Sequence, residues 1–179
     1  MSAAGAPDAD GSVGGSVGVS GGDAGRVLRA RADDLDAATL HALLRLRVDV
    51  FVVEQECPYP ELDGRDLEPG TEHVWHTGDG EVRDGERVPV AAALRVLDDP
   101  AGGPRRVGRV VTAPSARGRG LASVLLGDVV GRHGHEGLVL DAQAHLAGWY
   151  ARHGFQVVGE QFLEDGIPHV PMRRPGTAG

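Results

Sequence analysis

The tetrapeptide Arg117-Gly118-Arg119-Gly120 connects a β-branched run to an amphipathic pattern that predicts a helix from Leu121. The first backbone N–H groups of such a helix have no partners within it, and the helix dipole adds partial positive charge at the same end. Glycine lets the backbone come close to a ligand. The segment from Arg117 to Ala122 therefore favours binding of an anion such as a diphosphate.

Other interpretations of this loop are weaker. A nucleoside-triphosphate loop needs Lys followed by Ser or Thr, and the chain contains no Lys. The dinucleotide fingerprint needs a third glycine where Ser123 stands. The sequence RGRG also resembles RNA-binding repeats, but it occurs once and inside an apolar framework. A glycine-containing turn that holds no ligand stays open as the plain alternative.

A second segment, Leu138 to Phe155, predicts a buried strand and a helix that carries Trp149 and Tyr150 and ends at Gly154. Together with RGRGLA, which matches the pattern R/Q-x-x-G-x-G/A, this segment resembles the core of the GNAT superfamily of acetyl-CoA-dependent N-acetyltransferases. Three further segments resemble its ElaA-type branch: FVVEQECPY (51–59), AQAHL (142–146) and EDGIPH (164–169). The resemblance extends from about residue 35 to residue 174.

The resemblance implies that acetyl-CoA is the cosubstrate and lies in a gap between two splayed parallel strands, residues 107–112 and 138–142. Backbone groups of the first strand would pair with pantetheine, and the glycine loop would hold the pyrophosphate. Gln143 stands where many relatives carry Asn, so the carboxamide is kept on a longer side chain. The implied cofactor-binding residues are Val110, Val111, Thr112, Arg117, Gly118, Arg119, Gly120, Leu121, Ala122 and Gln143.

The implied reaction is attack of a neutral amine on a thioester, which requires a base, an oxyanion donor and an acid for the departing thiolate. By resemblance, Tyr150 is the acid and the Val111 amide the oxyanion donor. Glu54 and His145 are the candidate bases, and relay through water is a third option. The expected acceptor is a primary amine of a small molecule or peptide. A non-catalytic acyl-CoA sensor is the alternative function, and RNA binding through RGRG a third.

Cys57 is the single cysteine, so no intrachain disulfide can form. Its Pro- and Tyr-rich surroundings offer no helix N-terminus to lower the thiol pKa, which argues against a cysteine nucleophile. His73 and His76 with Cys57 or His169 are too scattered to predict a metal site.

The elements that must position these residues follow from hydrophobic periodicity. Asp36 is placed to cap a helix whose buried face is Leu40, Leu43, Leu44, Val48 and Phe51, and a long loop covers residues 55–70. Strands are expected at 73–77, 88–97, 107–112, 138–142, 155–162 and 169–172, with polar turns at 78–87 and 164–168. Two further helices are expected from Leu121 and over residues 144–153. The class is α/β (α+β) with one mixed sheet, as in the GNAT fold.

The 179 residues suit one domain at 25–174, between a disordered tail at 1–24 and a short C-terminal tail at 175–179. A net charge of −8 excludes general binding to nucleic acid or anionic membranes, and without a signal peptide or apolar span the location is expected to be cytoplasmic.

The charge pattern also suggests two local fields. Glu54, Glu61, Asp63 and Asp66 are expected to form a groove that attracts a cationic acceptor. Five arginines, at 105, 106, 109, 117 and 119, are expected around the diphosphate. The resemblance leaves a homodimer open.

Overall fold

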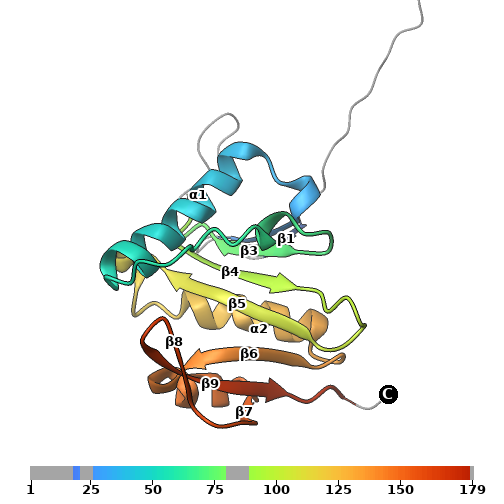
Figure 1. Ribbon diagram of the computed structural model, residues 1–179. Helices are drawn as coiled ribbons and strands as arrows, with labels where there is room; N and C mark the ends of the chain where they lie inside the picture. The colour runs from blue at the N-terminus through green and yellow to red at the C-terminus, as the bar shows by residue number, and fades with distance from the viewer. Residues whose placement is uncertain (1–17, 21–25, 80–88, 178–179) are drawn as a thin grey trace, which may run out of the picture.

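The computed structural model describes residues 18–20, 26–79 and 89–177. These residues form one mixed sheet in the order β1-β2-β3-β4-β5-β6-β9-β7, with β8 paired to β9 (Figure 1). The strands are β1 (Gly18–Ser20), β2 (Val27–Arg31), β3 (Glu72–His76), β4 (Ala92–Leu97), β5 (Arg105–Thr112), β6 (Leu138–Gln143), β7 (Gln156–Val157), β8 (Phe162–Glu164) and β9 (Ile167–Arg174). The helices are α1 (Ala37–Arg47), α2 (Leu121–His133) and α3 (Ala147–Ala151), and α1 continues as a π-helical segment, η2 (Val48–Glu54). Short 3-10 turns lie at η1 (Ala32–Asp34), η3 (Arg65–Leu67), η4 (Pro114–Ala116) and η5 (Ala144–Leu146).

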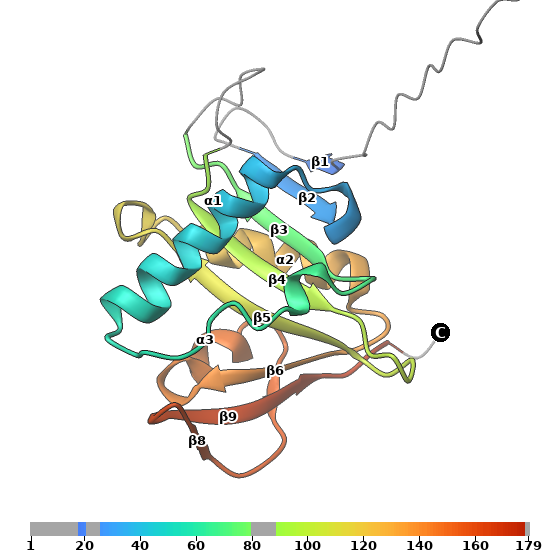
Figure 2. The ribbon, with the colours of Figure 1, turned by 45° about the horizontal axis from the view of Figure 1, so that its top comes forward.

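Helices cover both faces of the sheet (Figures 1 and 2). Because side chains alternate along a strand, neighbouring residues of β3 enter different cores. Val74 packs with Leu125 and Leu126 of α2, whereas Trp75 packs with Leu43 of α1. The predicted mixed sheet flanked by helices is confirmed.

The middle of the sheet opens between β5 and β6. This parallel pair is joined only at Arg105↔Leu138 and Arg106↔Val139. Beyond these positions β5 bends, because one extra residue interrupts its register with β4 between Ala93 and Arg95. Arg109 lies in this bulge with a φ of 54°, an uncommon conformation for a residue other than glycine. The two strands consequently diverge toward their C-terminal ends (Figure 2).

The first helix begins where the sequence predicts, but its buried face is different. Asp36 caps α1, with Oδ1 accepting from the Thr39 amide at 2.8 Å and Oδ2 from the Thr39 hydroxyl at 2.6 Å. The buried positions are Thr39, Leu43, Leu46, Arg47 and Val50. Of the expected face only Leu43 is fully buried, while Leu40, Leu44, Val48 and Phe51 are half-buried. The shift follows from β2, whose Leu28 and Ala30 pack against Leu43, Leu46 and Val50.

Several strand boundaries also differ from the sequence pattern. Gly18–Ser20 pair with β2, so the predicted disordered tail is wrong at these three residues, and the rest of residues 1–24 lies outside the described part of the chain. The strand expected from Val88 begins at Ala92, and most of the hairpin turn expected at 78–87 falls in the undescribed residues 80–88. The strand expected at 155–162 is instead the separate strands β7 and β8.

The last hairpin is tighter than predicted. Its two central residues, Asp165 and Gly166, have φ values of 49° and 80°. An Asp-Gly pair with both φ values positive is the pattern of a two-residue turn, so β9 begins already at Ile167. The helix expected at 144–153 is η5 followed by α3.

Candidate active site

A cavity of about 870 Å³ occupies the opening between β5 and β6. Its wall comes from seven parts of the fold: η2 with the loop after it, β4, β5, the glycine loop with the start of α2, β6, the η5–α3 segment and the β8–β9 hairpin. Among the predicted site residues, those in the wall are Glu54, Val110, Val111, Thr112, Arg117, Ala122, Gln143, His145 and Tyr150. Gly118, Arg119 and Gly120 lie in the adjoining loop, whereas the Leu121 side chain belongs to the core beneath α2.

The β5 edge that faces the cavity has no strand partner at residues 110–112 within the described ranges, and Arg117 Nε donates a 3.4 Å hydrogen bond to the Thr112 carbonyl there. On its other side Val111 and Thr112 are in register with Ala93 and Ala92 of β4. The pairing with β6 ends at Arg106, so it does not reach residues 110–112. An extended ligand with amide groups can pair with such an edge as an added strand.

The loop before α2 has the backbone conformation of an anion cradle. Gly118 and Gly120 have φ values of 74° and 76°. A Cβ atom at either glycine would meet nothing within 4 Å, so the backbone conformation and not crowding favours glycine. Helix α2 starts at Leu121 without a side-chain cap and without an acidic residue in its first turn. Its first amides are therefore available to an anion.

Both arginines of this loop are held by carboxylates. Arg117 makes two hydrogen bonds to Glu54, at 2.6 and 2.7 Å, and Arg119 pairs with Asp79. The hydrogen bond from Arg117 lowers the pKa of Glu54. A carboxylate with a lowered pKa and both oxygens occupied is a weak proton acceptor, which argues against Glu54 as the base.

Replacing Glu54 with Gln tests this pairing. The variant removes the negative charge opposite Arg117, so we expect acetyl-CoA to bind a few-fold more tightly at low salt, with the gain reduced at high salt. Calorimetry at two salt concentrations measures this effect. A hundredfold loss of turnover in Glu54→Gln would instead show that the carboxylate takes the proton.

Tyr150 presents a protonated phenol at the cavity wall. Its side chain is buried, with the Trp149 ring at 4.7 Å and the Phe155 ring at 6.0 Å between centroids. Burial raises the pKa of Tyr150 to about 12. Within the described ranges, no residue forms a hydrogen bond with its hydroxyl. The phenol therefore keeps its proton at neutral pH and can donate it to a group in the cavity.

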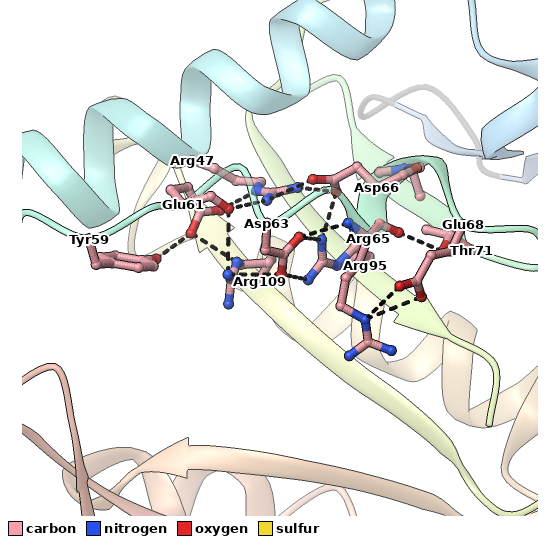
Figure 3. A network of polar contacts seen from close by, with 11 residues as sticks. Arg47, Tyr59, Glu61, Asp63, Arg65, Asp66, Glu68, Thr71, Arg95 and Arg109 are labelled. Atoms are coloured by element: carbon pink, nitrogen blue, oxygen red, sulfur yellow. Dashed lines mark hydrogen bonds and ion pairs between the residues drawn. The ribbon is translucent and has the colours of Figure 1, made fainter. Parts of the chain in front are cut away.

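The predicted acidic groove is wrong, because its carboxylates are neutralised. Figure 3 shows three carboxylates of the 57–70 loop lying among three arginines, a set we call the loop network: Glu61, Asp63, Asp66, Arg47, Arg95 and Arg109. Glu61 and Asp66 are buried, and Arg95 makes two hydrogen bonds of 2.8 Å to Asp63. Tyr59 also donates a hydrogen bond to Glu61. These charges fix the loop to α1, β4 and β5 and leave no net negative field from this set.

The predicted arginine cluster around the diphosphate is also wrong in part. Arg105 pairs with Asp98 and Glu136, Arg106 with Asp141, and Arg109 with Glu61. These three side chains lie along β5 and not at the glycine loop. Of the five arginines, only Arg117 and Arg119 belong to the loop. The prediction failed because it rested on closeness in sequence, whereas an extended strand places neighbouring residues far from the loop.

The other residues that the sequence analysis considered are His145, Cys57 and the possible metal ligands. His145 is exposed on η5. The Cys57 thiol is 3.5 Å from the Asp165 carbonyl oxygen, which it contacts as a weak donor. Across the described ranges, no three His, Cys, Asp or Glu side chains are arranged to hold a metal ion, and no helix there is long and apolar enough to cross a membrane.

A splayed parallel pair, a glycine loop at a helix N-terminus and a buried tyrosine at the gap are the parts of a GNAT acyltransferase. A family model for the acetyltransferase (GNAT) domain matches residues 84–175, and the chain belongs to this family. Its homologues include ElaA of Escherichia coli, 37% identical over 147 residues, which are 79% of this chain and 90% of ElaA. A UPF0039 protein of Mycobacterium tuberculosis is 51% identical over 152 residues, 83% of this chain and 92% of that protein.

Solved structures agree with this assignment. The crystal structure of Escherichia coli ElaA superimposes with a TM-score of 0.73 and 31% identity, covering 84% of this chain and 99% of ElaA. An acyl-CoA N-acyltransferase from Pseudomonas aeruginosa superimposes with a TM-score of 0.71 and 41% identity, covering 83% of this chain and 99% of that one. The predicted family and its ElaA-type branch are thereby confirmed.

Proposed function

We propose that this protein transfers an acetyl group from acetyl-CoA to a primary amine of a small molecule or peptide, by direct attack of the amine on the thioester. The observation that carries this proposal is the convergence of three features on one cavity: the β5 edge at residues 110–112, the glycine loop and the Tyr150 phenol. The family implies acyl-CoA as cosubstrate.

The residues present fit such a cosubstrate. The edge at Val110–Thr112 can pair with the two amides of pantetheine, and the amides from Gly118 to Ala122 can hold the diphosphate. The thioester carbonyl would then lie near a backbone amide of this edge, which can donate a hydrogen bond to the oxyanion that develops during attack. The expected donor, the Val111 amide, is directed toward Ala93 of β4 in this ladder, so the neighbouring Val110 amide is better placed on the cavity side. Tyr150 would protonate the departing thiolate.

A screen of amines tests the function by following thiol release from acetyl-CoA. Alkyl amines, polyamines, aminoglycosides and peptides are the panel, and acylated product is confirmed by mass. The same screen separates an enzyme from a sensor module. A protein that binds acetyl-CoA in calorimetry and acylates no amine would be the sensor.

Tyr150→Phe tests the acid. Without the phenolic proton, we expect kcat to fall by about 10²–10⁴, with the affinity for acetyl-CoA little changed. Steady-state kinetics with an accepted amine and calorimetry with acetyl-CoA measure the two effects. An unchanged kcat would show that Tyr150 is not the acid. If the affinity for acetyl-CoA fell by the same factor as kcat, Tyr150 would serve to shape the cofactor site and not to donate a proton.

A further inference from the structure

A histidine on β9 forms part of the same cavity wall. His169 is in register with Gln143, the last residue of β6, where β6 has already diverged from β5. Its side chain is 12% exposed and lines the cavity together with Tyr150. The imidazole stacks on Phe162 of β8 at 5.9 Å between centroids and 27° between planes. The stacking on Phe162 therefore holds the imidazole in place, while the ring also forms part of the cavity wall.

The hydrogen bonds of this ring determine its tautomer. Nδ1 is 2.9 Å from the carbonyl oxygen of Ile167. A carbonyl oxygen only accepts, so Nδ1 must carry the hydrogen. Neutral imidazole has a single N–H, which leaves a lone pair on Nε2. In the described part of the chain Nε2 has no hydrogen-bond partner, and the nearest carboxylate oxygen, on Glu164, is 3.9 Å away.

We propose that His169 is the general base for the amine, an inference that rests on the proposed acetyl transfer. The Nε2 lone pair takes one proton from the substrate ammonium, and the neutral amine attacks the thioester carbonyl. The C–S bond breaks as Tyr150 gives its proton to the thiolate, and the second N–H proton of the tetrahedral intermediate restores the phenol. The imidazolium releases its proton to solvent, so the net products are amide, thiol and one proton.

The surroundings favour this histidine over the other two candidates. Both carboxylate oxygens of Glu54 accept hydrogen bonds from the two terminal nitrogens of Arg117. His145 is exposed, and among the described residues no hydrogen bond fixes its ring. Glu164 on β8 is the charged group that the structure records beside the His169 ring, and β6 presents the neutral Gln143 opposite it. Asp165 in the turn and His145 on η5 line the same cavity. The Ile167 carbonyl and the Glu164 carboxylate both stabilise an imidazolium once it forms.

The tautomer can be measured without any acceptor. Long-range ¹H–¹⁵N correlation spectra of the full chain, with His169→Asn for assignment, report which ring nitrogen carries the hydrogen. We expect Nδ1 to carry the hydrogen and Nε2 to carry none in the neutral ring, with acetyl-CoA present or absent. A ring protonated at Nε2 in its neutral form would overturn the proposal.

Turnover is tested with two amines of nearly equal size. Ethylamine is protonated at neutral pH, whereas trifluoroethylamine is already neutral and needs no base before attack. His169→Asn keeps an N–H donor for the Ile167 carbonyl but has no basic nitrogen to take a proton from the amine. For this variant we expect about a 10²–10⁴-fold loss of kcat/KM with ethylamine and less than about a tenfold loss with trifluoroethylamine.

Three comparisons keep the result decisive. His169→Gln is a second variant in case His169→Asn folds poorly, and His41→Gln, exposed on α1 outside the cavity, controls for loss of a histidine. Equal loss with both amines, or a selective loss in His145→Gln instead, would overturn the assignment. If the wild-type protein acylated no amine of the screen, the acetyl-transfer function itself would be refuted. The tautomer measurement would still test whether the His169 ring has the protonation pattern that a base requires.

Discussion

Gly120→Glu is expected to abolish measurable binding of acetyl-CoA. The substitution places a carboxylate at the N-terminus of α2, where the structure leaves the first amides free for an anion. It also forces a side chain onto a residue with a φ of 76°, which costs about 1–2 kcal/mol of backbone strain. Together we expect at least about a hundredfold loss of affinity, about 2.7 kcal/mol, by calorimetry.

Two matched variants separate charge from strain and from folding. Gly120→Ala carries the strain without the charge, so it should lose much less affinity. Gly127→Glu introduces the same residue at an exposed position in the middle of α2, where a Cβ meets nothing within 4 Å, and should bind like the wild type. If Gly120→Glu kept wild-type affinity, the diphosphate would have to bind elsewhere.

Arg47→Met is expected to destabilise the fold by about 3–5 kcal/mol. The Arg47 side chain is 3% exposed and bonds both Glu61 and Asp66. Its loss would leave three carboxylates of the loop network with two arginines, and a buried charge without its partner is costly. Urea unfolding followed by circular dichroism measures the change.

Arg45→Met is the matched control on the same helix. Arg45 is 61% exposed and pairs with Asp49 at 3.5 Å, so its removal should change stability by less than about 0.5 kcal/mol. If the two variants lost equal stability, burial would not explain the importance of the network.

The same network predicts a loss of stability in acid. Hydrogen bonds from Arg95 lower the pKa of Asp63. Burial alone would raise the pKa of Asp66, but Arg47 and Arg95 hold it below its ordinary value of 3.8. As pH falls the unfolded chain therefore takes up protons first, so the stabilisation is complete above about pH 4 and is lost as pH falls through the lowered pKa values. Wild type and Arg47→Met should converge in stability there.

The features that could be predicted from the sequence are those set by residues close to one another in the chain. The glycine loop and the Asp36 cap are specified by residues within a few positions of one another, so their types and spacing are informative. Strand β2 was missed because VLRAR places two apolar residues side by side and then alternates arginine with alanine, which does not match the strict alternation expected of a half-buried strand. The bulge at Arg109 has no sequence signal either, since arginine is not a residue that favours a positive φ.

The charges of the site could not be predicted because their partners are distant in sequence. Arg117 pairs with Glu54, which lies 63 positions away in the sequence, and Arg109 bonds Asp63, which lies 46 positions away. From sequence alone the acids formed an attractive groove and the arginines an attractive cluster, whereas folding pairs one set with the other. His169 was likewise visible only as an isolated residue, because its tautomer depends on the geometry of the β8–β9 hairpin.

The short seam between β5 and β6 has a consequence for the lifetime of the protein. Only two residue pairs give β5 and β6 a backbone register, although the Arg106–Asp141 ion pair also links these strands. A ligand that pairs with the β5 edge and fills the cavity would also touch β6, which lines the opposite wall, and would therefore stabilise this junction in the folded chain only. At a hundredfold excess over its dissociation constant, such a ligand adds about 2.7 kcal/mol to folding. Resistance to proteases would then rise and fall with the supply of such a ligand.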